Sequence, residues 1–279
     1  MDLKEIALNE SHKRHPWELA RVKVISRFLK SLPNISKDVV TILDVGSGDT
    51  FLIKELSKEF GNARFFAIDT GYNAEYLQNA NTAFEKEKIN IRVFNDLTSS
   101  ESEIDHPVDV ILLLDVIEHV PDDVQFLKDL AAFNKVTDQT LFLITVPSYQ
   151  KLFCTHDVFL GHYRRYNNKL LIQNITKANL KALDIGYFFT FPLAPRFIQV
   201  LKEKLTTRNK DPKGIGNWEG NRFVSKFLEG MLLFDFSVSA FLRKFKIKLP
   251  GLSNFAVCKR SVSSFPVTTK QNDSTKITS

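Results

Sequence analysis

The stretch ILDVGSGDT, residues 42–50, decides the fold of this 279-residue chain. An apolar run leads into two glycines and a helical pattern follows, which together predict a strand, a tight turn and a helix. Without a Cβ, Gly46 and Gly48 let the backbone take positive φ values and approach a ligand closely. Asp49 or Thr50 can cap the helix that follows. The glycine pair also fits a βα turn that holds no ligand, so the neighbouring segments have to decide between the two interpretations.

Strands and helices alternate along the chain around this turn. Apolar, β-branched runs predict strands, and apolar residues at helical spacing predict helices. The expected strands are residues 39–43, 64–69, 90–94, 110–114, 141–146, 183–189 and 252–258. The expected helices are residues 16–30, 51–60, 74–88 and 121–133, one directly after Asn168, and 221–248. This order is typical of a doubly wound α/β domain built around a mostly parallel sheet.

The length suits one large α/β domain rather than two. We expect an N-terminal helical segment at 1–38, a domain at 39–260 with a helical insert at about 192–250, and a disordered tail at 261–279. The first residues lack the apolar core of a signal peptide, and no uncharged apolar run approaches the ~20 residues that span a bilayer. Two cysteines are too few for a disulfide framework, which favours a cytoplasmic protein.

Basic charge is concentrated in the insert and the strand that follows it. Residues 195–260 hold 14 Lys and Arg against 5 Asp and Glu, a local net of +9, although the whole chain is only +6. One stripe of the last long helix consists of Phe223, Phe227, Phe234, Val238, Phe241 and Phe245. A basic aromatic helix predicts contact with an anionic membrane surface, whereas such stripes also pack in cores and subunit contacts. Nucleic acid is a weaker alternative, because the chain has no recognition module.

Acidic residues stand at the ends of four successive strands: Asp44, Asp69, Asp96 and Asp115. The carboxyl ends of parallel strands meet at the edge where open α/β sheets bind ligands. A carboxylate there can accept hydrogen bonds from ribose hydroxyls, and another can accept from an adenine amino group. Each residue alone is more often a turn or cap residue. The four together predict a ligand that contains adenosine.

The glycine loop argues against a dinucleotide. A pyrophosphate favours the pattern GxGxxG at a helix N-terminus, and Phe51 stands at the third glycine position of that pattern. Asp49 would also repel phosphate. An adenosine ligand with positive charge and no phosphate fits better, and S-adenosylmethionine is such a ligand. A nicotinamide-dependent oxidoreductase and a non-catalytic binding protein on the same fold remain as alternatives.

Residues 39–146 resemble the core of class I S-adenosylmethionine-dependent methyltransferases. ILDVGSGDT is similar to their first motif, with Thr50 where a third glycine is usual. DVIEHVPDD, residues 115–123, resembles the motif after the fourth strand in the ubiquinone-type O-methyltransferase branch. ITVPSYQKLFCTHDVFLGHYRRY, residues 144–166, resembles a group of bacterial methyltransferases of unassigned substrate. The resemblance implies a doubly wound, mostly parallel seven-stranded Rossmann-like sheet with an inserted helical cap.

The resemblance also implies a role for each matching position in binding the cofactor. The methionine end would contact the first loop, the ribose would lie on the second strand end, the adenine near the third, and the sulfonium near the fourth. The cofactor-binding residues expected in this way are Asp44, Gly46, Ser47, Gly48, Asp69, Thr70, Asp96, Leu97, Asp115 and Val116. In relatives of the ubiquinone branch, residues matching Asp115, Glu118 and His119 bind a divalent metal. Whether this chain uses a metal stays open.

The polar segment after the fifth strand is the best candidate for acceptor chemistry. It contains His156, next to an aspartate, and His162 and Arg165 further on. Methyl transfer mainly requires alignment of the nucleophile and removal of its proton, and histidine is a natural base. We expect His156 to be the base, with His162 as second choice, while Arg164 or Arg165 could neutralise an anionic acceptor. All of them could instead be structural. The expected acceptor is the oxygen of a small or lipid-like molecule, because of the resemblance to the ubiquinone branch.

Overall fold

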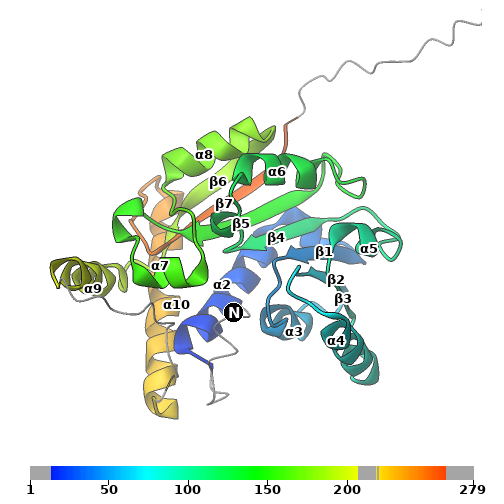
Figure 1. Cartoon of the computed structure of the whole chain (residues 1–279), viewed down its shortest axis with the longest axis horizontal. Coiled ribbons are helices and arrows are strands. Elements are labelled where there is room, and N and C mark those ends of the chain that lie inside the picture. The colour runs from blue at the N-terminus through cyan, green and yellow to red at the C-terminus, as the bar shows by residue number, and fades with distance from the viewer. Residues whose placement is uncertain (1–13, 207–217, 219, 262–279) are drawn as a thin grey trace, which may run out of the picture.

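The computed structural model describes residues 14–206, 218 and 220–261, and it forms a seven-stranded sheet covered by helices on both faces (Figure 1). The strand order is β3-β2-β1-β4-β5-β7-β6. The expected tail at 261–279, apart from Ser261, and the first part of the N-terminal segment lie outside the described residues. The strands are β1 Val40–Val45, β2 Ala63–Ile68, β3 Ile91–Phe94, β4 Val110–Leu114, β5 Leu141–Pro147, β6 Leu180–Phe188 and β7 Ser253–Arg260.

The first five strands are parallel, and β7 runs antiparallel to both of its neighbours, β5 and β6. The doubly wound, mostly parallel sheet expected from the sequence is therefore confirmed. Because β1 and β4 occupy the centre of the sheet, the carboxyl ends of these strands lie side by side. The loops that carry the predicted cofactor residues are thus brought to one edge.

Helices cover the two faces of the sheet. They are α2 Pro16–Ser31, α3 Phe51–Ser57, α4 Ala74–Lys86, α5 Leu97–Glu101, α6 Asp123–Ala131, α7 Thr155–Leu160, α8 Asn168–Lys177, α9 Leu193–Leu205 and α10 Arg222–Lys244. One core joins α2, α3, α4 and α10 to the sheet, and the other joins α6 and α8 to its opposite face. Alternate residues of a central strand point into different cores: Ile42 belongs to the first core and Leu43 to the second. This alternation explains why β1 is apolar on both faces.

The expected elements agree with the structure in type, and β4 has the expected bounds. Strand β6 begins at Leu180, three residues before the expected start, because a register shift between Ala182 and Asp184 interrupts its alternation. The segment that we expected to be one polar loop contains the short helix α7, on which His156 lies. Six residues are too few to show helical periodicity in a sequence.

The start of β7 depends on a glycine that has no space for a side chain. A Cβ on Gly251 would lie 2.2 Å from the carbonyl oxygen of Phe188, at the end of the neighbouring strand β6. The obstacle is backbone, which cannot rotate away. The close approach places Leu252 so that its N–H donates to the carbonyl of Phe189 at 2.9 Å.

We therefore expect Gly251→Ala to lower the free energy of unfolding by about 2–3 kcal/mol, as overpacking against fixed atoms does. Urea denaturation followed by circular dichroism measures the change. Gly230→Ala is the matched control, because a Cβ on Gly230 in α10 meets nothing within 4 Å. This control should raise stability slightly, by about 0.5–1 kcal/mol, since alanine is the better helix former. Equal stability of the Gly251 variant and the wild type would contradict the expectation.

Candidate active site

The glycine loop after β1 is pressed against the residue that follows β4. Gly46 and Gly48 have φ values of 75° and 58°, and a Cβ on Gly46 would lie 2.5 Å from Cγ2 of Val116. The N–H groups of Gly46 and Ser47 donate to the carbonyl of Ile68 at the end of β2, at 2.7 and 3.1 Å. These two glycines are required for conformation and space, so the loop is more specialised than an ordinary βα turn.

Asp69, directly after β2, is held by backbone amides from two loops. Its Oδ2 accepts from the N–H of Gly48 at 2.9 Å and its Oδ1 accepts from the N–H of Gly71 at 2.8 Å. The hydroxyl of Tyr72 donates to the carbonyl of Gly48 at 2.6 Å, and this second hydrogen bond also holds the glycine loop in place. The carboxylate is therefore oriented before any ligand binds, as a ribose-binding acid has to be. Thr70, the next residue, is exposed.

Asp44 is a buried acid in the middle of this site, with a relative exposure of 3%. Burial raises the pKa of its carboxyl to about 6, while a hydrogen bond with Ser47 and the charge of Arg21 partly oppose the shift. A carboxylate in this position is under-compensated, and a nearby cation would stabilise it. The ammonium group of S-adenosylmethionine would be such a cation.

Asp96 lies further out, at the N-terminus of α5. It is exposed, and its Oδ1 accepts from the N–H of Ser99 at 2.7 Å, as a helix cap. Leu97, the first residue of α5, is half-buried. The structure places both residues after β3, where the adenine is expected, and their contact with adenine stays a prediction.

Asp115, directly after β4, pairs with an arginine from the N-terminal helix. Arg21 of α2 forms an ion pair with Oδ2 of Asp115 and donates to Oγ1 of Thr145 at 3.0 Å. That hydroxyl in turn donates to Oδ1 of Asp115 at 3.1 Å. The φ of Asp115 is 59°, an unfavourable value for a residue with a Cβ, and such strain is often found at functional sites.

Sequence reasoning missed the role of Arg21, although a signal for it exists. On α2 it falls on the same stripe as the apolar residues Trp17, Val24 and Phe28, at helical spacing. An arginine among core positions is rarely buried without an acidic partner. The structure buries most of this side chain, with 11% exposed, and gives it Asp115 as partner.

The loop after β4 places Glu118 in the protein interior, fully buried. Neither carboxylate oxygen has a hydrogen-bond partner within the described residues. Burial, and after it the charge of Asp115, raise the pKa of Glu118 well above its usual range. Glu118, His119 and His162 each offer an atom that could ligate a metal, and these atoms lie within 4.8 Å of one another. The two imidazole rings pack edge to face, with their centroids 4.5 Å apart.

The segment after β5 centres on Asp157 of α7, which is completely buried. Its Oδ1 lies 2.8 Å from Nδ1 of His162 and accepts from Nε of Arg165 at 2.8 Å, and its Oδ2 accepts from the N–H of Cys154 at 2.9 Å. Burial alone would raise the pKa of Asp157, but the hydrogen bond with His162 and the charge of Arg165 outweigh it and hold the pKa well below its usual range. The pairing leaves Nε2 of His162 for a second partner.

The structure thus separates the predicted catalytic residues. Asp157 orients a histidine, as expected, and Nδ1 of His162 lies 2.8 Å from its carboxylate, whereas His156 is half-buried on α7. Arg165 has 6% of its side chain exposed and donates to Asp157 and to the carbonyl of Ser148, so it acts on the site through Asp157. Arg164 donates to the carbonyls of Val120 and Pro121 and holds the loop after β4.

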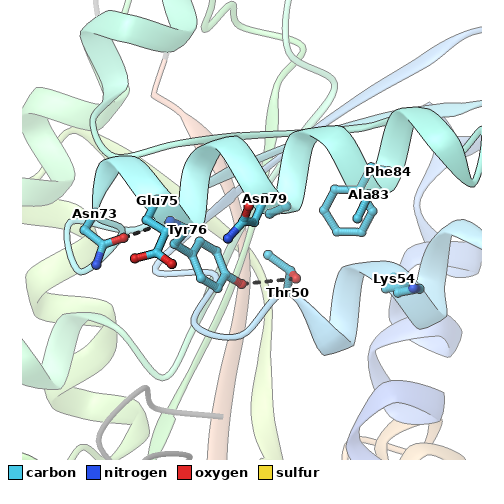
Figure 2. A pocket seen from close by; sticks show the side chains of 9 residues that line it. Thr50, Lys54, Asn73, Glu75, Tyr76, Asn79, Ala83 and Phe84 are labelled. Carbon is cyan, nitrogen blue, oxygen red and sulfur yellow. Dashed lines mark hydrogen bonds between the residues drawn. The ribbon is translucent and has the colours of Figure 1, made fainter.

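An open hollow of about 530 Å³ lies beside this site, between α3 and α4 (Figure 2). Lys54, Asn79 and Phe84 line it, together with Thr50 and Tyr76, which also border the glycine loop. The hydroxyls of Thr50 and Tyr76 are 3.5 Å apart. The hollow is therefore adjacent to the first loop but is distinct from the edge where the four acids gather.

Comparison with known proteins agrees with this geometry. Residues 42–136 match the family model described as "Methyltransferase domain". No curated protein matches the chain significantly. Residues 42–136 therefore carry a methyltransferase domain, and the seven-stranded sheet that contains them has the fold of class I S-adenosylmethionine-dependent methyltransferases.

Solved structures show the same fold at low identity. A candidate sarcosine dimethylglycine methyltransferase from Galdieria sulphuraria is 13% identical, with a TM-score of 0.52, and the match covers 87% of this chain and 86% of that one. A complex of the Haloferax volcanii Trm112 methyltransferase activator with a methyltransferase gives 14% identity, a TM-score of 0.51, and coverage of 88% and 95%. The [4+2]-cyclase SpnF gives 11% identity, a TM-score of 0.50, and coverage of 92% and 86%. The fold therefore extends well beyond the residues of the family match.

The position of Asp69 makes cofactor binding testable. Calorimetry should show that S-adenosylmethionine and S-adenosylhomocysteine bind and that NAD does not. Asp69→Asn should weaken binding of both by about 1.5–3 kcal/mol, the scale of lost hydrogen bonds to a charged acceptor. Asp105→Asn, an exposed acid before β4, is the matched control and should bind as the wild type does. Unchanged affinity in the Asp69 variant would remove this residue from the site.

The raised pKa of Asp44 predicts a pH dependence. Between its usual pKa of about 4 and the folded-state value of about 6, the folded chain binds more protons than the unfolded chain, so stability falls as the pH rises through this window. Without cofactor, Asp44→Asn should therefore raise the free energy of unfolding above pH 6 by up to about 2 kcal/mol, since it removes a buried charge. Chemical denaturation at several pH values measures this. The gain should vanish near pH 4, and a variant that is less stable than the wild type at neutral pH would contradict the argument.

Proposed function

We propose that the enzyme methylates an oxygen of a small or lipid-like acceptor, and that His162 takes up the proton of that oxygen. The observation that carries the proposal is the hydrogen bond between His162 and the buried Asp157, close to Glu118 and Asp115. An aspartate on Nδ1 fixes the tautomer that presents Nε2 as the base. The arrangement supports proton removal beside the strand end where the sulfonium is expected.

Each residue has a defined part in this proposal. Bound S-adenosylmethionine supplies an electrophilic methyl group, so that the new O–C bond forms as the S–C bond breaks and S-adenosylhomocysteine is released. Nε2 of His162 accepts the acceptor proton, and Asp157 stabilises the resulting imidazolium. Asp44 and Asp115 offset the positive charges of the cofactor, and Arg165 keeps Asp157 ionised and in place. Alignment supplies most of the rate gain expected for such a displacement.

A metal-assisted version of the same reaction is the second candidate. Glu118, His119 and His162 offer three donor atoms that a divalent cation can use, and Asp157 on the far nitrogen of His162 is the type of partner that orients a metal-binding imidazole. A cation there would polarise the acceptor oxygen. Turnover that survives treatment with EDTA supports direct proton removal, and turnover that requires an added cation supports the metal.

A binding protein without methyl transfer is the alternative of another class. The [4+2]-cyclase among the structures of the same fold shows that the fold by itself does not guarantee one chemistry. Labelled S-adenosylmethionine, incubated with the enzyme and extracts of small molecules and lipids, distinguishes the two. Label in an extractable product supports methyl transfer, and its linkage to oxygen or nitrogen identifies the methylated atom.

The pairing of His162 with Asp157 leads to a prediction about turnover. His162→Gln should keep cofactor affinity and lower the rate of methyl transfer about 100-fold or more, as loss of a general base does. His156→Gln is the matched control, since it changes the neighbouring histidine on α7 in the same way. A large loss in His156→Gln with normal turnover in His162→Gln would reverse the assignment in favour of His156.

A further inference from the structure

Helix α10 exposes a row of phenylalanines along its outward side. Phe223, Phe227, Phe234, Phe241 and Phe245 have relative exposures of 58–80%. Their spacing of four and seven residues places them within about 40° of one another around a helix of 3.6 residues per turn. The opposite side carries Leu232, Phe236 and Ser239, which are buried, and the ring of Phe236 packs on Phe28 of α2 at 5.3 Å. The aromatic stripe noted in the sequence is thus not the core-facing side of the helix.

Helix α9 also exposes a group of apolar side chains. Its exposed apolar side chains are Phe197, Ile198, Leu201 and Leu205. Among the described residues, 17 large apolar side chains are exposed, and 12 of them lie between Phe191 and Ile247. Both helices lie on the side of the molecule opposite α4 and α5 (Figure 1). Apolar side chains concentrated in this way mark an interaction surface, whereas single exposed ones need no explanation.

Lysines border this surface. Lys226 and Lys244 are exposed on the same flank of the phenylalanine row, and Lys246 and Lys248 are exposed just beyond the end of the helix. Within the described residues, none of these four forms an ion pair with an acid. Some of this charge suits the C-terminal end of the helix dipole, but Lys226 lies in the first turns, where a cation gains nothing from it.

We propose that the outward faces of α9 and α10 form a surface that docks on an anionic lipid bilayer. Exposed phenylalanines enter the boundary between headgroups and acyl chains, and the bordering lysines meet the acidic headgroups. Among the described residues, no helix is long and apolar enough to cross a membrane. The inference goes beyond the proposed function and does not depend on it.

The proposed docking surface is joined directly to the acceptor side of the site. The carboxylate of Glu203 in α9 accepts from the N–H of Thr155, the first residue of α7, at 2.8 Å. Arg196, also in α9, contacts the sulfur of Cys154 at 3.1 Å. Since Asp157 lies on α7 and His162 follows the end of this helix, a bilayer against α9 would lie close to the residues that are proposed to handle the acceptor.

Flotation with vesicles tests the proposal on the full chain. Vesicles of phosphatidylcholine alone are compared with vesicles that contain roughly 30% phosphatidylglycerol, at low salt and at about 0.5 M salt. The enzyme should float with the anionic vesicles at low salt, and at least about fivefold less protein should float with neutral vesicles or at high salt. Phe234→Ser/Phe241→Ser should abolish flotation, and Lys226→Glu/Lys244→Glu should abolish the preference for anionic vesicles.

Matched controls change exposed residues elsewhere. Ile172→Ser/Leu183→Ser removes two exposed apolar side chains outside the insert, and Lys86→Glu/Lys177→Glu reverses two exposed lysines. Both should float as the wild type does. Circular dichroism checks that each variant is folded. We expect all of them to fold, because the changed side chains are exposed. Absence of folded wild type from anionic vesicles at low salt overturns the proposal, as does equal flotation of the phenylalanine variant. A dimer that the phenylalanine variant converts to a monomer, without vesicle binding, would make this face a subunit contact instead.

Discussion

Carboxylates crowd at the carboxyl ends of β1, β2 and β4, and the architecture of the site depends on how their repulsion is offset. Asp69 is held by two amides, whereas Asp49 is paired with Arg14, just before α2, and Asp115 is paired with Arg21 of α2. The segment formed by Arg14 and α2 therefore supplies two cations to this edge of the sheet, although it is not part of the alternating strands and helices. Asp44 receives less compensation, as its raised pKa shows. The edge as a whole favours a ligand with positive charge, and a phosphate ligand would add to the repulsion.

The same ion pair constrains how the site works. Arg21 pairs with Asp115 at the strand end where the sulfonium is expected. The guanidinium and the sulfonium would therefore compete for the same carboxylate. The core packing of α2, through Val24, Ile25 and Phe28, fixes the helix axis. If a cofactor binds at Asp115, the side chain of Arg21 can therefore move more easily than the helix. Thr145 already provides this arginine with a second hydrogen-bond acceptor. In this arrangement Arg21 would keep a hydrogen-bond acceptor in Thr145 if a bound cofactor took over Asp115.

Much of the fold could be predicted because its signals are local. The apolar runs of β1 and β4 and the glycines at 46 and 48 specify strands and a tight turn with no knowledge of distant residues. The pairing of His162 with Asp157 could not be predicted in the same way. His156 and His162 both stand near Asp157 in sequence, and the choice between them depends on Gly161, whose φ of 81° ends α7 and turns the chain back. That turn brings Nδ1 of His162 to Asp157, and adjacency in sequence does not show it.

The orientation of α10 was also beyond sequence reasoning, because the helix is apolar on two sides. Periodicity identifies a stripe but cannot tell which of two stripes faces the core. The smaller inner stripe, with Leu232 and Phe236, packs on α2, while the more aromatic stripe faces outward. The outer phenylalanines bury little surface within the chain and so add little to its stability. Packing among the described residues therefore accounts for the inner side of the helix only, and the proposed contact with a bilayer accounts for the aromatic composition of the outer side.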